Sequence, residues 1–348
     1  MVRMKDVANR AGVSVATVSN VITGKRIVSP EVQDAVLRAI DELDYHVNLV
    51  ARGLKTQKTG IIGVVLPDVT KLFFNDVLKG IVATADEYGY SIHILSSSFD
   101  FKKEQAHIET LRGSHVDAII LDSCVDYHAA GRWGAELTGM FTPAIPIVSI
   151  ENTLDDGKVS AVTIDCRRWS GLVTQHLIDQ GNRRIFYISG PLSLEHEYDR
   201  LRGYLETLEK NKLAADRELI TSRDFLSGSA YHVVRQALEA GIAFDAIQAS
   251  NDQAAVGAVK ALRESGRSVP EQTAVTGFDN LFPSSLVQPA ITTVHVPRYT
   301  MGFEAVREAV RRLESPSAAP KHLTLDCHLV IRGSSARVPE TPWDLENW

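Results

Sequence analysis

The segment MKDVANRAGVSVATVSNVI, residues 4–22, decides the fold of the first part of the chain. Four apolar side chains in its first half follow helical spacing, namely Met4, Val7, Ala8 and Ala11. Gly12 interrupts this period and tolerates the positive φ of a tight turn, and Ser14 can cap the helix that follows. Helical spacing resumes over residues 15–22. The segment therefore predicts two short helices joined by a three-residue turn, which is a helix-turn-helix.

The second predicted helix has small side chains on its outer face, which are Val15, Ala16, Thr17 and Asn20. Small side chains let a helix sit deep in the major groove of DNA. A third helix is predicted from residue 30, because Ser29 suits the cap position and Pro30 the first helical position. Its apolar stripe would cover the first two helices.

Charge is distributed unevenly along the chain. Residues 1–60 carry nine Lys or Arg and six Asp or Glu, so their net charge is +3, whereas the whole chain has a net charge of −6. The remaining residues therefore have a net charge of −9. A basic head on an acidic body favours an anionic partner at one end only.

Length and composition exclude several classes of protein. The chain has 348 residues, of which 44% are hydrophobic and 23% charged, as expected for two or three globular domains. The longest apolar runs, such as Ile61–Pro67, are too short to span a membrane. The first residues contain no apolar signal-peptide core, which predicts a cytoplasmic protein with no membrane partner.

Sequence motifs indicate no catalytic, metal or cofactor site. The three cysteines, Cys124, Cys166 and Cys327, are far apart and predict neither a disulfide framework nor a zinc site. Glycine-rich phosphate loops, an HExxH motif and a nucleophile elbow are not found. We therefore predict a protein that is not an enzyme and needs no cofactor.

Beyond Gly60, predicted strands and helices alternate. Strands are expected at residues 61–66, 91–95, 118–122, 147–150, 161–164, 184–189, 246–249 and 273–276. Helices are expected at residues 75–88, 102–114, 128–138, 167–180, 199–210, 228–240 and 252–265. This alternation predicts parallel sheets, and two rounds of it, the second starting at residue 161, predict two similar α/β halves.

Polar side chains follow several of these predicted strands, among them Asp68, Glu151, Asp165, Asn251 and Asp279. Ligands of open α/β sheets bind at the carboxyl ends of the strands. Carboxylates and an amide in this position predict a polar cleft with acceptors for hydroxyl groups.

Three segments in a fixed order resemble the lactose-repressor (LacI/GalR) family of bacterial transcription regulators. They are the helix-turn-helix segment, VSPE at residues 28–31 and NLVARGL at residues 48–54, and the resemblance continues more loosely to about residue 335. It implies an all-α helix-turn-helix domain at residues 1–47, a hinge helix and linker at 48–59, and a periplasmic-binding-protein-like core at 60–340. The core would consist of two Rossmann-like subdomains, at about 60–162 with 291–322 and at about 163–290 with 323–340.

The resemblance implies that Val15, Ala16 and Asn20 read DNA bases. Alanine and valine can contact a thymine methyl group, and asparagine can form two hydrogen bonds with adenine. Family members often have Arg or His where this chain has Asn20, so we expect a preference for adenine there. Contacts with phosphates, which set the register, are expected from Lys5, Ser14, Thr17 and Ser19.

The implied hinge helix would bind the minor groove. Asn48 would cap this helix, Leu54 would insert as an apolar wedge and bend the duplex, and Arg52 and Lys55 would flank the wedge. Val47 stands where the family usually has proline. A helix this short is marginal in water, so we expect it to fold only on DNA beside the hinge of a partner subunit.

The resemblance also implies residues that contact a small effector. They are Phe73, Phe74, His196, Arg200, Phe225, Asn251 and Asp279, to which the strand-end rule adds Glu151 and Asp165. Lys71 and Leu72 replace the usual Asn-Pro before the aromatic pair, so the loop there is expected to differ.

The resemblance implies a homodimer, or a tetramer, that binds near-palindromic operator DNA and acts as a repressor under allosteric control. A sugar or sugar derivative suits an effector site of acids, an amide, an arginine and aromatic rings. A purine-type corepressor is an alternative. A cytoplasmic sugar-active enzyme is a second alternative, for which Glu195, His196 and Glu197 would form the cluster.

Overall fold

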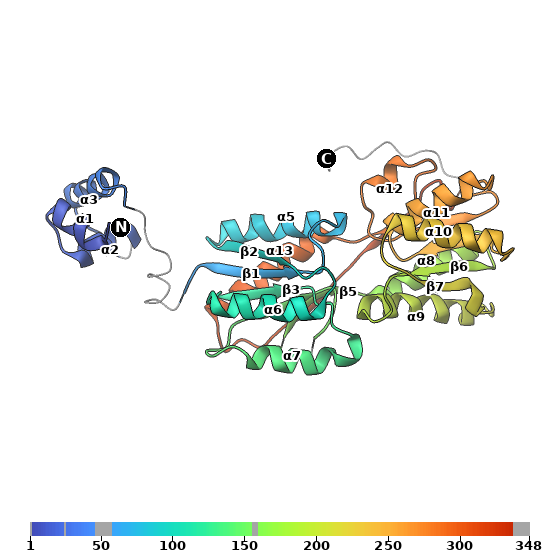
Figure 1. Cartoon of the computed structure of the whole chain (residues 1–348), viewed down its shortest axis with the longest axis horizontal. Helices are drawn as coiled ribbons and strands as arrows, with labels where there is room; N and C mark the ends of the chain where they lie inside the picture. Colours follow the sequence, from blue (N-terminus) through green and yellow to red (C-terminus); the bar gives the residue numbers. More distant parts are fainter. Residues whose placement is uncertain (1, 24–25, 46–57, 155–158, 337–348) are drawn as a thin grey trace. The chain divides into compact units, whose positions relative to one another are not determined.

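The computed structural model describes residues 2–23, 26–45, 58–154 and 159–336. The chain divides into two units, Met1–Thr59 and Gly60–Trp348 (Figure 1). The predictions for Asn48, Arg52, Leu54 and Lys55 lie outside the described residues. None of the described helices is long and apolar enough to cross a membrane.

The first unit contains the predicted helix-turn-helix. Its helices are α1 (Met4–Ala11), α2 (Val15–Thr23) and α3 (Pro30–Glu42). Gly12 ends α1 with a φ of 67°, and the Ser14 hydroxyl accepts a hydrogen bond of 3.0 Å from the Thr17 amide at the start of α2. Ser29 caps α3 in the same way, at 3.5 Å from the Val32 amide. The three helices bury a small common core of Val7, Ala8, Val18, Val36 and Ala39.

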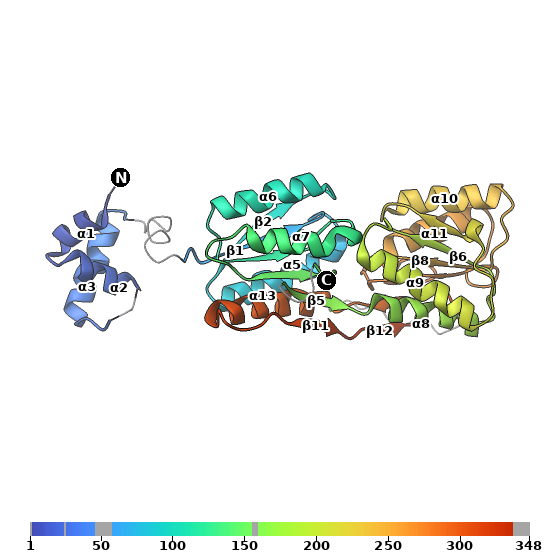
Figure 2. The same cartoon turned by 90° about the horizontal axis from the view of Figure 1, so that it is seen from below.

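The first half of the second unit is a parallel sheet covered on both faces. Its strand order is β11-β5-β4-β3-β1-β2. The strands are β1 (Ile61–Leu66), β2 (Ser91–Ser96), β3 (Ala118–Leu121), β4 (Ile147–Ile150), β5 (Ser160–Ile164) and β11 (His322–Leu325). Helices α5 (Leu72–Glu87) and α13 (Arg298–Glu314) cover one face, and α6 (Phe101–Gly113), η1 (Tyr127–Ala129) and α7 (Ala130–Gly139) the other (Figures 1 and 2).

The second half repeats this plan with a smaller sheet of order β7-β6-β8-β9, also parallel. Its strands are β6 (Ile185–Ser189), β7 (Ile220–Ser222), β8 (Ala246–Ala249) and β9 (Ala274–Thr276). Helices α8 (Cys166–Asp179) and α9 (Glu195–Lys210) cover one face, and α10 (Ser227–Glu239) and α11 (Asp252–Glu264) the other (Figure 2). The short elements η2 (Arg217–Leu219) and α12 (Pro283–Leu286) complete it.

The chain passes between the two halves more than once. It leaves the first sheet after β5, returns to it at α13, and leaves again after β11. The antiparallel pair β10 (Thr293–His295) and β12 (His328–Val330) accompanies the later passages. The connection between the halves is therefore made by segments that lie far apart in the sequence.

Two expectations about the halves differ from the structure. Strand β5 does not open the second half but pairs with β4 in the first sheet, so the first passage falls after Ile164 instead of residue 162. Residues 323–325, expected in the second half, belong to β11 of the first sheet. The order of strands and helices along the chain does not show which sheet a strand joins. Strand β5 pairs with β4, which precedes it, and with β11, which follows more than 150 residues later.

Candidate functional site

The outer face of helix α2 carries the residues predicted to read DNA. Val15 is 44% exposed, and Ala16 is exposed as well, whereas Asn20 is half-buried. Lys5 on α1 and Ser14 before α2 are exposed, and Thr17 and Ser19 are half-buried. The Ser14 hydroxyl lies 2.9 Å from the Thr17 hydroxyl, so this pair fixes the start of the helix in addition to any phosphate contact. The DNA contacts of these residues stay predictions.

Replacing Asn20 by Arg is expected to change the preferred base from adenine to guanine at one position of each half-site. Arginine donates two hydrogen bonds to guanine, and such a pair discriminates against other bases by about 1–3 kcal/mol. Binding selection from randomised duplexes measures the preference. Asn9→Arg, an equal charge change on exposed Asn9 of α1, should leave it unchanged. An unaltered preference in Asn20→Arg would show that Asn20 reads no base.

A cavity lies between the two halves of the second unit, at the carboxyl ends of the strands. Eight of the nine predicted effector residues line it, namely Phe73, Phe74, Glu151, His196, Arg200, Phe225, Asn251 and Asp279. The empty space between the lining side chains is about 580 Å³, counting the part that opens to solvent.

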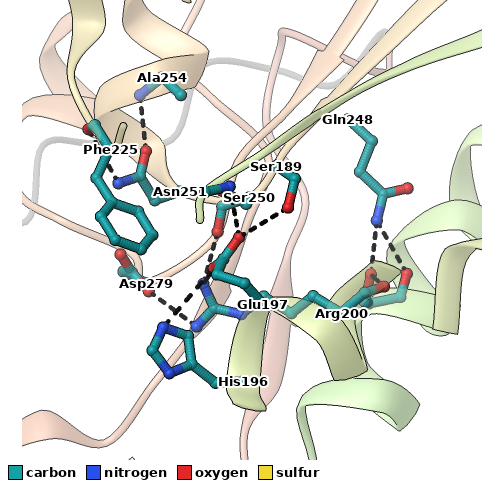
Figure 3. Close-up of polar contacts among 12 residues, drawn as sticks. Ser189, His196, Glu197, Arg200, Phe225, Gln248, Ser250, Asn251, Ala254 and Asp279 are labelled. Atoms are coloured by element: carbon teal, nitrogen blue, oxygen red, sulfur yellow. Dashed lines mark hydrogen bonds and ion pairs between the residues drawn. The ribbon is translucent and has the colours of Figure 1, made fainter. Parts of the chain in front are cut away.

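Arg200 on α9 is the centre of the polar network (Figure 3). Its Nη1 donates to Glu197 Oε1 at 2.9 Å and to the Ser250 carbonyl at 2.8 Å, and its Nη2 lies 3.8 Å from Asp279 Oδ1. The guanidinium carbon lies 4.0 Å from the centre of the Phe278 ring. Its side chain is only 4% exposed, so the arginine is a fixed, buried cation.

Glu197 is held in place behind Arg200. Its Oε2 accepts a hydrogen bond of 3.3 Å from the hydroxyl of Ser189, the last residue of β6 (Figure 3). It also accepts one of 2.6 Å from the amide of Gly190, the next residue. Gly190 is required here, because a Cβ atom would lie 2.3 Å from the Phe225 ring. The carboxylate therefore pairs with Arg200 through its other oxygen and fixes the orientation of the guanidinium.

Three buried carboxyl groups face the cavity from the ends of strands β3, β4 and β9, and they belong to Asp122, Glu151 and Asp279. Burial raises the pKa of all three, to about 7 for Glu151 and well above the usual range for Asp122 and Asp279. Repulsion from Glu151 adds to the rise for Asp122 and Asp279, and Arg200 opposes it for Glu151 and Asp279. Glu151 and Asp279 have positive φ values of 66° and 100°, which are strained for residues other than glycine.

Several buried polar atoms of the cavity have no hydrogen-bond partner in the described part of the chain. They are Glu151 Oε1, His196 Nδ1, Arg200 Nε and Asp279 Oδ1. Burial lowers the pKa of His196 to about 3, so this ring is neutral and its 3.9 Å approach to Glu197 is no ion pair. Unpartnered buried polar groups are costly, so the cavity is arranged for a polar ligand.

Aromatic rings and an amide complete the cavity. Phe73 and Phe74 meet edge to face with ring centres 5.3 Å apart, and Phe225 lies 5.8 Å from Phe99 of the other half. Asn251 caps α11 by accepting from the Ala254 amide at 2.8 Å and also donates to the Phe225 carbonyl at 3.2 Å (Figure 3). Asn251 is thus a helix cap and a cavity residue at the same time.

Two predicted groupings are not found at the site. Asp165 is exposed and caps α8 by accepting from the Arg168 amide at 2.9 Å, and it lines a groove between α8 and α9 instead of the cavity. Glu195, His196 and Glu197 do not converge on one point. Glu195 accepts hydrogen bonds of 2.6 and 2.7 Å from Thr153 of the other half, whereas Glu197 binds Arg200.

The sequence interpretation missed Asp122, Ser123 and Phe99, which also line the cavity. Asp122 directly follows β3 and matches the strand-end rule, whereas the strand predicted at residues 118–122 includes Asp122 as its last residue. The loop after β3, which contains Asp122 and Ser123, is held by buried Glu104. This carboxylate accepts hydrogen bonds from the Ser123 hydroxyl at 2.6 Å and from the indole of Trp133 at 3.0 Å. Glu104 also accepts a hydrogen bond from the Cys124 thiol at 3.1 Å.

No group of side chains that could hold a metal ion occurs within the residues that the structure describes.

The raised pKa of Glu151 predicts how the stability of the ligand-free core depends on pH. The folded pKa, about 7, lies above the ordinary 4.5, so the folded core holds a proton that the unfolded chain releases between these values. The stability that this proton gives the folded core is fully present below pH 4.5 and is lost as the pH rises through 7. Glutamine does not titrate, so the free energy of unfolding of Glu151→Gln should rise relative to that of the wild type as the pH increases, by up to roughly 3 kcal/mol at pH 8.

Urea unfolding of both proteins between pH 5 and 8 measures this difference. Glu136→Gln, which removes an exposed carboxylate on α7, is the control and should show no such trend. A difference between Glu151→Gln and the wild type that stays constant over the range would contradict the assigned burial.

A helix-turn-helix unit and a two-lobed α/β core with a polar cavity at its strand ends define a class, the DNA-binding transcription regulators with a periplasmic-binding-protein-like core. Family models agree with both parts. The model described as bacterial regulatory proteins of the lacI family matches residues 3–48. The model described as a periplasmic binding protein-like domain matches residues 174–335.

Relatives match along nearly the whole chain. The ribose operon repressor of Escherichia coli K12 is 32% identical over 335 residues, covering 96% of this chain and 100% of the relative. Catabolite control protein A of Priestia megaterium is 33% identical over 338 residues, covering 96% and 99%. The structure of the lac repressor dimer bound to operator and the anti-inducer ONPF superposes with a TM-score of 0.86 at 26% identity, covering 96% and 99%. The chain belongs to the lacI family of bacterial regulatory proteins.

Proposed function

We propose that this regulator is a repressor that binds near-palindromic operator DNA as a homodimer and changes its operator affinity when a sugar fills the cavity. The observation that carries this proposal is the cavity itself, where a buried arginine, three carboxyl groups and aromatic rings converge between two halves. The relatives support it by their names, among them the ribose operon repressor and a CelR–cellobiose complex with a TM-score of 0.71 at 31% identity.

The DNA contacts belong to the same proposal. Residues 1–47 would bind the major groove through Val15, Ala16 and Asn20, with Lys5, Ser14, Thr17 and Ser19 on phosphates. Residues 48–59 would form the hinge, with Asn48, Arg52, Leu54 and Lys55 at the minor groove, and residues 60–340 would bind the effector and the partner subunit.

Contacts across the cleft offer a physical route from the ligand to the rest of the core. Arg298, at the start of α13, donates to Asp76 of α5 at 2.6 and 3.1 Å and also to the carbonyl of Asp279. Tyr127 of the first half stacks on Tyr198 of the second with ring centres 4.6 Å apart. A ligand that favours one spacing of the halves shifts the population toward it, which is the basis of allosteric control.

The test is a native-gel titration of DNA fragments selected by the full-length protein. We expect retention to change on addition of a sugar and to fall steeply with salt. A chain without residues 1–59 should lose all retention. Retention by the shortened chain would contradict the assignment of DNA binding to the head, and a response only to nucleobases would favour a purine-type corepressor.

A further inference from the structure

Two direct contacts join the halves of the core outside the cavity, and together we call them the latch. In the first, the carboxylate of Glu195 on α9 accepts hydrogen bonds from the Thr153 amide at 2.6 Å and from the Thr153 hydroxyl at 2.7 Å. In the second, the amide of Tyr127 in η1 donates to the Ser193 carbonyl at 2.9 Å. The Tyr127 ring also stacks on that of Tyr198, with ring centres 4.6 Å apart and an angle of 17° between the planes. None of these five residues lines the cavity.

The first half presents the latch on two loops that are fastened to each other. Tyr127 follows β3, and Thr153 follows β4. The side-chain amide of Asn152 donates to the Ser123 carbonyl at 2.8 Å, which joins the loop after β4 to the loop after β3. The Glu104 carboxylate holds the second of these loops from α6. A displacement at one contact of the latch is therefore passed to the other.

The second half presents the latch and the cavity wall from the first two turns of α9. Glu195 and Tyr198, three residues apart, contact the first half. His196 and Arg200, four residues apart, line the cavity (Figure 3). Residues with these spacings lie on one side of a helix, so neighbouring sides of α9 serve the latch and the cavity. A movement of α9 that opens the latch also moves Arg200.

The chemistry of the latch favours a persistent contact. Hydrogen bonds that a carboxylate accepts are shorter and stronger than those between neutral groups, and both bonds to Glu195 are short. Thr153, Glu195, Tyr127 and Tyr198 are all half-buried, so water has limited access to the contacts. The stacked tyrosine rings add attraction beyond the area that they bury.

We infer that the latch holds the two halves together in the ligand-free protein, and that its two contacts form and break as one unit. The cavity then opens when the latch opens, and the latch sets the balance between the closed and open core on which any ligand acts. The latch does not depend on the chemistry of that ligand. Only its consequence for operator binding rests on the proposed function.

Hydrogen exchange of the full-length, ligand-free chain tests the latch, with mass spectrometry that resolves single residues. The amides of Thr153 and Tyr127 donate from one half to the other, so they exchange when the halves separate. We expect both to be protected roughly 100-fold or more relative to an unstructured peptide.

Substitutions at one contact should release the other. Glu195→Ala removes the acceptor of the Thr153 amide and should also speed exchange at Tyr127 by roughly tenfold or more. Tyr198→Ala removes the stacked ring and should likewise speed exchange at Thr153. If each substitution speeds exchange only at its own contact, the two contacts are independent and the inference falls.

Two controls separate opening from unfolding. Glu209→Gln removes an exposed carboxylate further along α9 and should leave both amides unchanged. The amide of buried Ile119 in β3, which donates to the Pro146 carbonyl within the first half at 3.0 Å, should exchange equally slowly in every variant. Faster exchange at Ile119 in the latch variants would identify unfolding of the first half as the cause and would overturn the inference.

The same variants distinguish the latch from the proposed function. Native-gel retention of the selected DNA fragments by ligand-free Glu195→Ala should differ by roughly threefold or more from that of the wild type, because the spacing of the halves is coupled to the head in the proposed function. Faster exchange at both amides with unchanged retention would support the latch and contradict the proposed allosteric control. Unchanged exchange at both amides would overturn the latch, whatever the retention.

Discussion

Arg200→Ala should abolish the response of operator binding to sugar and lower the free energy of unfolding of the core. The guanidinium is 4% exposed and its partner Glu197 is fully buried, so the substitution leaves a carboxylate without its cation. Removing one partner of a buried pair typically costs about 3–5 kcal/mol. Calorimetric titration of the sugar and urea unfolding, both on the full chain, measure the two effects.

A matched control lies two residues further along the same helix. Arg202 is 42% exposed, its ion pairs are long, at 3.8 Å to Asp199 and 3.9 Å to Glu206, and its guanidinium carbon lies 5.9 Å from the centre of the Tyr198 ring. Exposed pairs contribute about 0–1 kcal/mol, so Arg202→Ala should change stability little and leave sugar binding intact.

A double variant distinguishes loss of folding from loss of binding. Replacing Arg200 and Glu197 together by Met and Leu removes both buried charges, and such replacements are often neutral or stabilising. We expect this variant to recover much of the stability without recovering the sugar response. A normal sugar response in either Arg200 variant would show that the arginine does not contact the effector.

The head could be predicted closely because its signals are local. The turn depends on one glycine with a positive φ, and the starts of α2 and α3 depend on the capping hydroxyl groups of Ser14 and Ser29. These signals act within three or four residues along the chain. The observed helices begin at the predicted residues, Val15 and Pro30.

The core was predictable in type but only partly in topology. Buried parallel strands such as β1 are short apolar runs, which the sequence shows directly. Helix α13 was not expected, although Met301, Ala305 and Ala309 follow helical spacing, and strands of three residues such as β7 and β10 are too short to show a period. The passages between the halves depend on pairings over more than 150 residues, such as that of β11 with β5.

The candidate site shows what a strand-end rule can and cannot do. It located Glu151 without any family resemblance, and applied to β3 it would have located Asp122. It failed for Asp165, because the rule gives the place of a residue but not the direction of its side chain. That side chain turns back to cap α8. Arg200, by contrast, lies on a helix and came only from the resemblance.

Gly80→Ala should destabilise the core strongly and weaken sugar binding with it. Helices α5 and α13 touch through their backbones at two glycines. A Cβ atom on Gly80 would lie 2.1 Å from the Tyr299 carbonyl oxygen, and one on Gly302 would lie 2.1 Å from that of Val77. Backbone atoms cannot move aside as a flexible side chain can, so the helices must separate. Overpacking of this kind typically costs about 1–3 kcal/mol and sometimes more.

Gly131→Ala on α7 is the matched control, because a Cβ atom there meets nothing within 4 Å. Alanine in a helix is favoured over glycine by roughly 0.5–1 kcal/mol, so this variant should be slightly more stable than the wild type. Urea unfolding measures both changes. Equal effects of the two substitutions would show that helix propensity, and not the contact of the helices, decides the outcome.

The effect on the sugar follows from what α5 and α13 carry. The first turn of α5 holds Phe73 and Phe74 of the cavity wall, and Asp76 on the same helix binds Arg298 at the start of α13. Separating the helices therefore shifts one wall of the cavity and strains the contact of Arg298 with the Asp279 carbonyl. Gly302→Ala, from the other side of the same contact, should weaken the sugar as Gly80→Ala does. Because the two substitutions act on one contact, their costs should not add.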